Sequence, residues 1–479
     1  MTERRSAREV VTFVADDSTF TELPYPTRDS KPDGPLTWQG YDTSRARAAE
    51  RTGETESVVC GTATVTGTRA VLIAFEFGFL GGSLGERTGD RLESAYAYAR
   101  EHRLPVVPLI ATGGSRMQEG MLALTQLQRV AHQSALTREA GLPQIAVLRD
   151  PTTGGGWATL GAGADVILAL SGAQVGFAGS RVRPPDADPA AYTAAGQLAA
   201  GAVDAVVLLT ELRETLGRWL RLLSEPTVRD APQGGVGLHQ SAAPPRSATS
   251  HDGAADATRP NPATPHAAPL PPALTTQELP TTGWDAVQNA RSPQRPRAEA
   301  YLDVYFAHRE AISGDRCGGT DPGMLCGFGA HDGRTVAFAA QTGTPTRPAG
   351  YRTAARLIRL AGRLGIPVLT LVDTPGAAND AEAERQGAGA AIADVFAAVA
   401  AARTPVTTLV IGEGGSGGAL ALAAPGNTWA TPDSYFSVIA PESAAAILKR
   451  PPEEVEATAD QLRLRPQDLL ELGVIRGVV

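Results

Sequence analysis

The chain has 479 residues, enough for about two or three domains, and its hydrophobic content of 42% is ordinary for a protein that buries a core. Its formal net charge of −8 is spread without long runs, which argues against nucleic-acid binding, because that needs a basic face. The three cysteines, Cys60, Cys317 and Cys326, contain no C-x-x-C pair, which excludes a four-cysteine zinc site and makes a disulfide framework unexpected.

The amino-terminal sequence MTERRSAREV lacks the apolar stretch of a secretory signal. No uncharged apolar run reaches the length of about 18 residues that a membrane span needs. We therefore expect a cytoplasmic protein with no membrane partner.

In the first half of the chain, residues 61–77 (GTATVTGTRAVLIAFEF) predict a strand hairpin closed by a glycine turn. Two apolar runs follow, at 105–114 (PVVPLIATGG) and 143–156 (PQIAVLRDPTTGGG), each with the length and β-branched content of a buried strand. Between them, residues 117–140 have a helical pattern. Strand, glycine turn, helix and strand form a βαβ unit, whose crossover should be right-handed.

Residues 226–286 are rich in Pro, Ala, Ser and Thr and have little aliphatic periodicity. Such a segment buries too little apolar surface to offset the entropy of ordering. We predict a disordered linker there, between domains at 1–225 and 287–479. His239, His251 and His266 fall in this segment, which argues against metal-binding or catalytic roles for them.

The second half repeats the first. Residues 325–341 (LCGFGAHDGRTVAFAAQ) predict another hairpin, and apolar runs at 365–377 and 403–418 flank a helical pattern at 387–402. The prolines that begin the paired runs are 38 residues apart in both halves: Pro105 and Pro143, then Pro367 and Pro405. The matching spacing and apolar pattern favour an internal duplication of an α/β domain built from stacked β-β-α units.

Each of these runs ends in a glycine-rich turn, of which GEGGSGG (residues 412–418) is the most extreme. A strand that enters a helix through glycines leaves backbone N–H groups unpaired at the helix start. Two such donors, held rigidly, stabilise an oxygen that gains negative charge during a reaction. A single turn of this kind is more often only a tight turn, but four comparable turns, two in each half, favour the oxyanion hypothesis.

Two other hypotheses apply to these turns. No G-x-x-x-x-G-K-[ST] motif occurs, so a phosphate-binding loop of that class is not expected. The pattern G-x-S-x-G does occur around Ser416, so an α/β-hydrolase with a serine nucleophile is an alternative. Against it, the last histidine, His331, lies upstream of Ser416, so no triad histidine follows the nucleophile.

The first half resembles the β subunit of the carboxyltransferase of acetyl-CoA carboxylase, and the second half resembles the α subunit. The β-type stretches are FEFGFLGGSLGERTGDR, ATGGSRMQEGMLALTQ, LPQIAVLRDPTTGGGWATLGAGADVILA and VGFAGSRV. The α-type stretches are ARSPQRPRAEAYLD, SGDR, GYRTAARLIRLAGRLGIPVLTLVDTPGA, IGEGGSGGALAL and YFSVIAPESAAAILKR. The resemblance covers most of residues 8–225 and 287–479 and implies the crotonase-like ββα spiral twice in one chain.

The resemblance also implies a reaction, the transfer of a carboxyl group from carboxybiotin to the α-carbon of an acyl-CoA. The first half would bind the coenzyme A thioester and the second would bind biotin. No side-chain base is implied, because biotin that has lost CO2 can remove the α-proton.

Backbone groups would then hold the two oxygens that become negatively charged. The expected donors to the thioester oxygen are Gly113, Gly114, Ser115, Gly154 and Gly155, and those to the biotin ureido oxygen are Gly414, Gly415, Ser416 and Gly417. The expected binding residues for CoA or biotin are Arg116, Gly179, Arg181, Gly376 and Ala377.

Single side chains allow two interpretations each. Arg116 either contacts phosphate or anchors its turn, and Arg181 either positions a CoA phosphate or caps local carbonyls. Glu119 fits a charge at a helix start better than a base, His132 fits a structural role, and the cysteines fit small packing residues better than nucleophiles.

The implied partners are biotin carboxyl carrier protein, biotin carboxylase and a second copy of the chain in a two-fold pair. The chain departs from the family pattern in three places: it lacks a zinc ribbon, it has ANDAEAERQGAGAA after DTPGA, and it has AQTGTPTRPA before GYR. The second departure keeps Glu384, Arg385 and Gly387. Three alternatives therefore stay open: a biotin-independent decarboxylase of a malonyl-type thioester, an enzyme recruited to a specialised biosynthetic pathway with a different acceptor, and a non-catalytic assembly partner.

Overall fold

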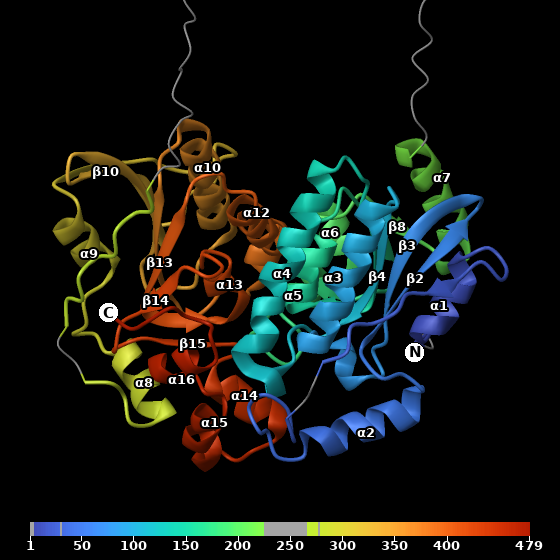
Figure 1. Cartoon of the computed structure of the whole chain (residues 1–479), viewed down its shortest axis with the longest axis horizontal. Helices are drawn as coiled ribbons and strands as arrows, with labels where there is room; N and C mark the ends of the chain where they lie inside the picture. The colour runs from blue at the N-terminus through green and yellow to red at the C-terminus, as the bar shows by residue number, and fades with distance from the viewer. Residues whose placement is uncertain (1–3, 29–30, 225–265, 276–277) are drawn as a thin grey trace, which may run out of the picture.

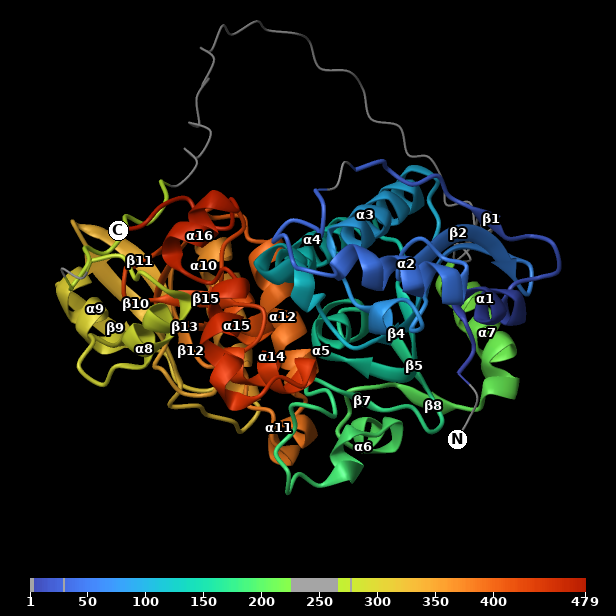
Figure 2. The ribbon, with the colours of Figure 1, turned by 90° about the horizontal axis from the view of Figure 1, so that it is seen from below.

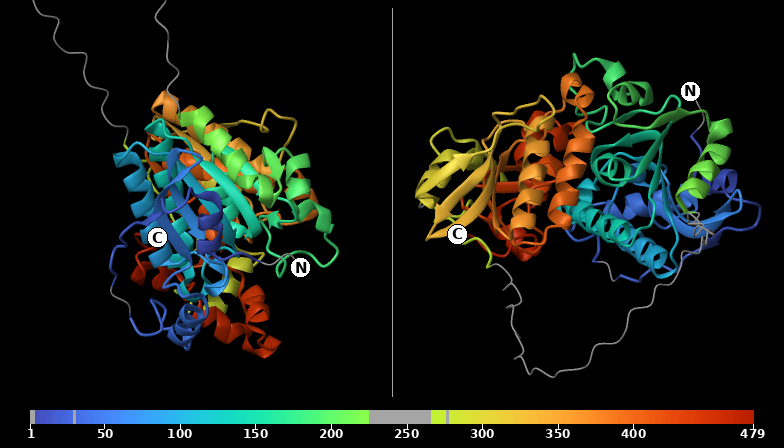
Figure 3. Two further views of the ribbon diagram at one scale, coloured as in Figure 1. Left: turned by 90° about the vertical axis from the view of Figure 1, so that its right-hand side faces the viewer. Right: turned by 90° about the horizontal axis from the view of Figure 1, so that it is seen from above.

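The computed structural model describes residues 4–28, 31–224, 266–275 and 278–479. These residues form two α/β halves that lie side by side, each built around its own sheet (Figure 1). The same side-by-side arrangement is visible from below (Figure 2) and from above (Figure 3, right). No helix among the described residues is long and apolar enough to cross a membrane.

The first half contains an 8-stranded sheet in the order β1-β2-β3-β4-β5-β6-β8, with β7 paired to the end of β5. Its strands are β1 (Thr21–Glu22), β2 (Val58–Val65), β3 (Thr68–Phe75), β4 (Val106–Thr112), β5 (Ile145–Thr153), β6 (Val166–Leu170), β7 (Val175–Gly176) and β8 (Ala205–Val207). Its helices are α1 (Ala7–Val14), α2 (Tyr41–Thr52), α3 (Glu86–Glu101), α4 (Gly120–Glu139), α5 (Gly154–Gly156), α6 (Ala194–Ala199) and α7 (Leu212–Ser224).

The second half contains a 7-stranded sheet in the order β14-β13-β12-β11-β10-β9, with β15 paired to the end of β13. Its strands are β9 (His308–Ala311), β10 (Met324–His331), β11 (Arg334–Gln341), β12 (Val368–Thr374), β13 (Val406–Gly415), β14 (Thr428–Ala430) and β15 (Tyr435–Ser437). Its helices are α8 (Gly283–Arg291), α9 (Ala298–Tyr305), α10 (Pro348–Leu364), α11 (Ala381–Arg385), α12 (Ala388–Ala400), α13 (Ser416–Leu420), α14 (Pro441–Leu448), α15 (Val455–Gln461) and α16 (Pro466–Glu471).

The internal repeat predicted from the proline spacing is confirmed by the strand pairing. In each half an antiparallel hairpin (β2–β3, β10–β11) is followed by parallel strands (β4 and β5, β12 and β13). In each half the last of these strands also changes partner near its end, since β5 leaves β6 for β7 and β13 leaves β14 for β15. The predicted helices are also present, as α4 and α12.

The outer face of each sheet is covered locally. In the first half α1 and α7 pack there against alternate residues of β2 to β6, and in the second half α9 packs against β11 to β13. Both faces of the central strands are therefore buried, which explains why these strands are nearly continuous apolar runs in the sequence.

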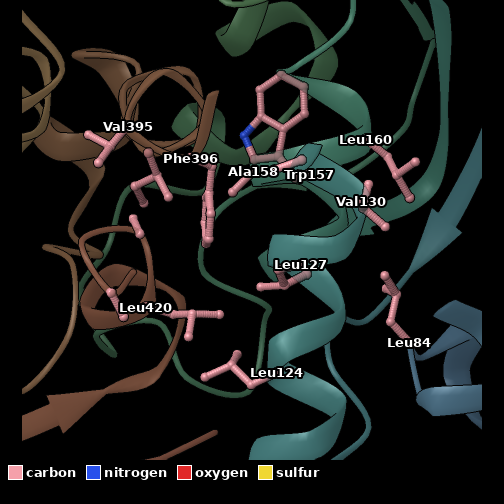
Figure 4. Packing of buried hydrophobic residues seen from close by; sticks show 14 of the residues in the cluster. Leu84, Leu124, Leu127, Val130, Trp157, Ala158, Leu160, Val395, Phe396 and Leu420 are labelled. Atoms are coloured by element: carbon pink, nitrogen blue, oxygen red, sulfur yellow. The ribbon is translucent and has the colours of Figure 1, made fainter. Parts of the chain in front are cut away.

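The inner faces share one core that extends across both halves. Helix α4 of the first half and helix α12 of the second half lie next to each other in it (Figure 1). Leu127 and Trp157 contribute from one side and Phe396 and Leu420 from the other (Figure 4). The two halves thus pack against each other through buried apolar side chains. This packing fixes the position of one half relative to the other.

The predicted linker, residues 226–286, differs from the structure at its end. Ala268 is only 4% exposed, and its carbonyl oxygen accepts a hydrogen bond from Thr407 Oγ1 at 2.9 Å. The Tyr305 hydroxyl donates to the Pro269 carbonyl oxygen at 2.9 Å, and α8 begins at Gly283. The ordered second half therefore begins before residue 287. The predicted disorder of residues 226–265 lies outside the described residues.

Candidate functional site

A cavity of about 900 Å³ lies between the two halves. The first half contributes the turns after β4 and β5 and the segment after β7, and the second half contributes the turns after β12 and β13 and the start of α14. The predicted residues on its wall are Gly113, Gly114, Ser115, Arg116, Gly154, Gly155, Gly179, Arg181, Gly376, Ala377, Ser416 and Gly417. The structure therefore brings most of the predicted site together, from four turns and one loop that are far apart in the sequence.

The two turns of the first half touch each other. Strands β4 and β5 are parallel neighbours, so their carboxyl ends lie at the same edge of the sheet. Gly114 has φ of +109° and Gly154 has φ of +64°, and a Cβ at Gly154 would lie 3.1 Å from the Cα of Gly114. Only glycine allows both this backbone conformation and this close approach.

Three of the five predicted donors in these turns already have acceptors inside the protein. The N–H of Gly113 donates to the carbonyl oxygen of Gly81 at 2.9 Å, and that of Gly114 donates to Thr112 Oγ1 at 3.0 Å. The N–H of Gly154 donates to the carbonyl oxygen of Phe177 at 3.1 Å.

The remaining two donors are the N–H groups of Ser115 and Gly155. Outside the regular helix and strand ladders, neither donates to an acceptor among the described residues. One available donor is thus left on each turn, and the other three N–H groups hold the turns in place.

On the second half, two of the four residues predicted as donors, Gly414 and Gly415, lie away from the cavity wall. Strand β13 continues through Gly414 and Gly415, which pair with Phe436 and Ser437 of β15 and do not line the cavity. A Cβ at Gly415 would lie 2.0 Å from the Pro375 carbonyl oxygen, so this glycine is required for close packing. The sequence pattern could not separate these residues from their neighbours, because glycine serves both purposes.

The chain turns from β13 into α13 at Ser416, which has φ of +56°. Ser416 and Gly417 line the cavity, opposite the first half. A Cβ placed on Gly417 would lie 3.7 Å from Leu127 Cδ1 and 3.8 Å from the Phe177 ring, both residues of the first half. Gly417 is therefore the point where the α-type turn directly faces the opposite wall.

Arg116 anchors its turn through its side chain and does not offer its guanidinium to the cavity. Its side chain is fully buried and donates to both Glu56 carboxylate oxygens and to the Ser83 carbonyl oxygen at 2.7 Å. Although burial alone would raise the pKa of Glu56, the Arg116 guanidinium holds it below its usual range. Of the two interpretations of Arg116, the structure favours anchoring over phosphate binding.

Glu119 is a structural acceptor near the same anchor. Its carboxylate accepts from the N–H of Glu86 at 2.6 Å, at the start of α3, and from the Tyr41 hydroxyl and Arg116. This agrees with the interpretation of Glu119 as a charge at a helix start and not as a base.

Other single-residue expectations differ in outcome. Cys60 and Cys326 are buried as packing residues, whereas Cys317 is exposed and does not fit that expectation. His132 is exposed on α4, outside the cavity wall. Arg181 is exposed and lines the cavity, and its contact with CoA stays a prediction.

Several wall residues were not predicted. Arg4 and Arg51 add basic groups to the cavity, and Arg4 also pairs with Asp150 at 3.2 Å. Phe177, Asn379 and Ile439 also line it. These residues have no local motif that could have revealed them, since only the packing of the two halves brings them to one wall.

The cavity contains no histidine from the described residues that could activate Ser416. His331 stacks on the Tyr305 ring with centroids 3.9 Å apart, and its Nδ1 bonds to the Tyr305 backbone oxygen, on the side of β10. This geometry argues against the hydrolase alternative. The described residues also contain no group of three or more His, Cys, Asp or Glu side chains placed to hold a metal ion.

Comparison with known proteins matches each half to a carboxyltransferase family. Residues 275–479 match the family described as acetyl co-enzyme A carboxylase carboxyltransferase-like, and residues 37–206 match the carboxyl transferase domain. The acetyl-coenzyme A carboxylase carboxyl transferase subunits beta/alpha of Salinispora arenicola are 38% identical over 97% of this chain and 80% of the relative.

Two further relatives support the assignment. The same-named protein of Saccharopolyspora erythraea is 37% identical over 92% of this chain and 74% of its own length. A probable biotin-dependent acyl-coenzyme A carboxylase beta3 subunit of Mycobacterium bovis is 32% identical over 94% of this chain and 85% of its own length. The chain belongs to the carboxyltransferase family of the biotin-dependent acyl-CoA carboxylases, with a β-type half followed by an α-type half.

Proposed function

We propose that this chain transfers a carboxyl group from carboxybiotin on a carrier protein to the α-carbon of an acyl-CoA, through an enolate held by backbone N–H groups. The observation that carries the proposal is the cavity itself. Glycine turns of the β-type half and of the α-type half face each other across it, so two substrates bound on opposite walls would meet.

The β-type wall suits the thioester. The N–H groups of Ser115 and Gly155 come from two touching turns, so they can converge on one oxygen. Such donors stabilise the oxygen most when it becomes negative in the enolate, and they require no rearrangement at that moment. The N–H groups of Gly113, Gly114 and Gly154 support this arrangement through their own internal bonds.

The thioester's CoA portion would extend toward the basic part of the cavity. Arg4, Arg51 and Arg181 line the same cavity, and Gly179 lies beside Arg181 with room next to its backbone. Guanidinium groups bind phosphate well because their N–H groups form a planar fork. We assign the CoA phosphates to this group of arginines in place of Arg116.

The α-type wall suits the biotin ureido group. Gly376, Ala377, Ser416 and Gly417 expose backbone with at most small side chains, which leaves space for a flat ring against the wall. The N–H groups at the start of α13 would hold the ureido oxygen. Carboxybiotin would supply the carboxyl group and, once that group has left, the base for the α-proton.

The proposed partners follow from this chemistry: a biotin carboxyl carrier protein and the biotin carboxylase that loads it. A two-fold pair of chains stays a prediction. Because both walls of the cavity come from one chain in this structure, the sharing of a site between two chains is not required by the arrangement.

The test is incubation of the full chain with carboxylated biotin carrier protein and a panel of acyl-CoAs, with products identified by mass. A new carboxyl group on one of the acyl-CoAs is the expected result. Turnover of a malonyl-type thioester in the absence of any biotin protein would contradict transfer and indicate decarboxylation. The absence of any product with a fully folded chain would contradict both enzymatic functions.

A further inference from the structure

Glu384 lies in α11 of the α-type half but makes its hydrogen bonds with the β-type half. Its side chain is fully buried, and Oε1 accepts from the backbone N–H of Phe177 at 2.6 Å and of Ala178 at 3.1 Å. Oε2 accepts from Gln197 Nε2 at 3.4 Å. All three donors belong to the β-type half, so this carboxylate is a contact between halves.

The carboxylate has no cationic partner among the described residues. The nearby Arg183 directs its guanidinium to the Ala178 carbonyl oxygen at 3.0 Å and packs over the Tyr192 ring. Burying a carboxyl group that has only uncharged hydrogen-bond donors is costly, and buried ionisable groups of this kind cluster at functional sites. Burial raises the pKa of Glu384 to about 7.

The peptide that Glu384 holds is connected to the proposed enolate site. The backbone N–H of Phe177 donates to Glu384 Oε1, and the carbonyl oxygen of Phe177 accepts a hydrogen bond from the N–H of Gly154 at 3.1 Å. Gly154 directly precedes Gly155, one of the two available donors of the β-type wall. Three consecutive links therefore lead from an α-type carboxylate to a β-type donor.

Two further hydrogen bonds near Glu384 also join the β-type half to the α-type half. The Tyr192 hydroxyl of the β-type half donates to the Asn379 carbonyl oxygen at 2.6 Å, and Asn379 Nδ2 donates to the Val182 carbonyl oxygen at 3.0 Å. Position 176 must be glycine here, because a Cβ would lie 2.9 Å from the Tyr192 ring and 3.2 Å from Glu384 Oε1. The contacts between the two halves therefore leave no spare room around the Glu384 carboxylate.

We propose that Glu384 is a positioning residue that sets the Gly154–Gly155 turn from the opposite half, so that the thioester oxyanion site is complete only when the α-type half is docked. This inference rests on the proposed function. It also assigns a role to the altered segment after DTPGA, which keeps Glu384 although its surroundings depart from the family pattern.

The experiment compares Glu384→Ala, Glu384→Gln and Arg385→Ala in the full chain. Arg385 is the matched control, because it lies next to Glu384 and also bonds the β-type half, through Asp188, but both of these side chains are about half exposed. Glu384→Ala should lower kcat by about tenfold or more with little change in KM for the acyl-CoA, since small displacements of a catalytic group are costly. Glu384→Gln keeps an acceptor oxygen and should recover most of kcat, and Arg385→Ala should stay within about twofold of wild type.

Amide hydrogen exchange at Phe177 and Ala178 provides a readout that needs no substrate. Both amides should be protected in wild type and exchange faster in Glu384→Ala. Asn379→Ala, which keeps Glu384, provides a second variant if Glu384→Ala does not fold, and it should lower kcat in the same direction.

Unprotected amides in wild type, or equal loss of kcat in the Gln and Ala variants, would overturn the positioning role. If wild type shows no carboxyl transfer, the proposed function fails, whereas the exchange result still decides whether Glu384 holds the wall.

Discussion

The indole of Trp157 in the β-type half lies against the backbone of Gly389 in the α-type half. A Cβ at position 389 would come within 2.0 Å of Trp157 Nε1 and 2.5 Å of its Cδ1, and Trp157 is fully buried. Helix α12 can approach the β-type half this closely only because its second residue, Gly389, has no side chain.

Replacing Gly389 with alanine should therefore weaken the packing between the halves. The rigid indole cannot move aside without disturbing the shared core, so we expect a loss of about 1–3 kcal/mol in the free energy of unfolding. Thermal or denaturant unfolding followed by tryptophan fluorescence measures this. Gly362→Ala in α10 is the control, because a Cβ there meets nothing closer than 3.9 Å and alanine favours a helix. Equal stability of Gly389→Ala and wild type would contradict the packing argument.

Gly417→Ala should impair catalysis in a protein that still folds. The added methyl makes only ordinary contacts, the nearest at 3.7 Å, so the melting temperature should stay near that of wild type. The methyl would project into the space where the ureido group must approach, and we expect kcat/KM to fall about tenfold or more. By contrast, Gly415→Ala should fail to fold properly, because its Cβ would lie 2.0 Å from the Pro375 oxygen. Full activity of Gly417→Ala would argue against a ligand at this turn.

Ser416→Gly distinguishes backbone chemistry from a serine nucleophile. The φ of +56° suits glycine at least as well as serine, so the turn should keep its shape. If only the N–H groups of the turn act, carboxyl transfer should continue at a rate within a fewfold of wild type. Complete loss of activity in a folded Ser416→Gly protein would show that the hydroxyl takes part in the reaction.

The stability of the chain should depend on pH through Glu384. Its pKa is raised from 4.5 to about 7 by burial, so between these values the folded chain keeps a proton that the unfolded chain has lost. The folded state is therefore destabilised as pH rises through this window, by up to about 3 kcal/mol. Arg183 is the charged neighbour that opposes the shift.

Because Glu384→Gln removes this titration, its melting temperature relative to wild type should increase between pH 5 and pH 8, about the limits set by these pKa values. A constant difference across that range would contradict a raised pKa.

Two neighbouring parts of the predicted linker should respond differently to change. Removing about 30 residues from 226–265 should have little effect on activity, since the entropy of loop closure changes slowly with length. Ala268→Asp should destabilise the α-type half, because it places an unpaired charge in a buried apolar cluster. Limited proteolysis and melting temperature provide the comparison. A stable Ala268→Asp protein would show that residues 268–275 do not contribute to that half.

The order of strands and helices could be predicted because a parallel strand that is buried on both faces appears in the sequence as a continuous apolar run. The apolar runs before Gly113 and before Gly414 are of this kind, and they became β4 and β13. The clustering of the glycine turns within each half has the same physical origin, since the carboxyl ends of neighbouring parallel strands lie at one edge of the sheet. What the sequence pattern could not distinguish was a glycine that faces the cavity with open space beside it, such as Gly417, from one that only permits close packing, such as Gly415.

Side-chain roles were harder to predict because they depend on contacts between distant segments. Arg116 lies in a glycine turn, and from the sequence phosphate binding and anchoring were equally reasonable roles. Its ion pair with the buried Glu56 decides in favour of anchoring. The role of Glu384 depends on a strand end that is 207 residues away in the sequence. No local pattern carries information about such a partner.

One chain supplies both walls of the cavity, and this changes how the site responds to dilution. Separate subunits must find each other, so the fraction of complete sites falls with protein concentration. Halves joined covalently meet at an effective concentration that the connecting segment sets and that dilution does not lower. Synthesis also always produces the two halves in equal number, so neither wall accumulates without its counterpart.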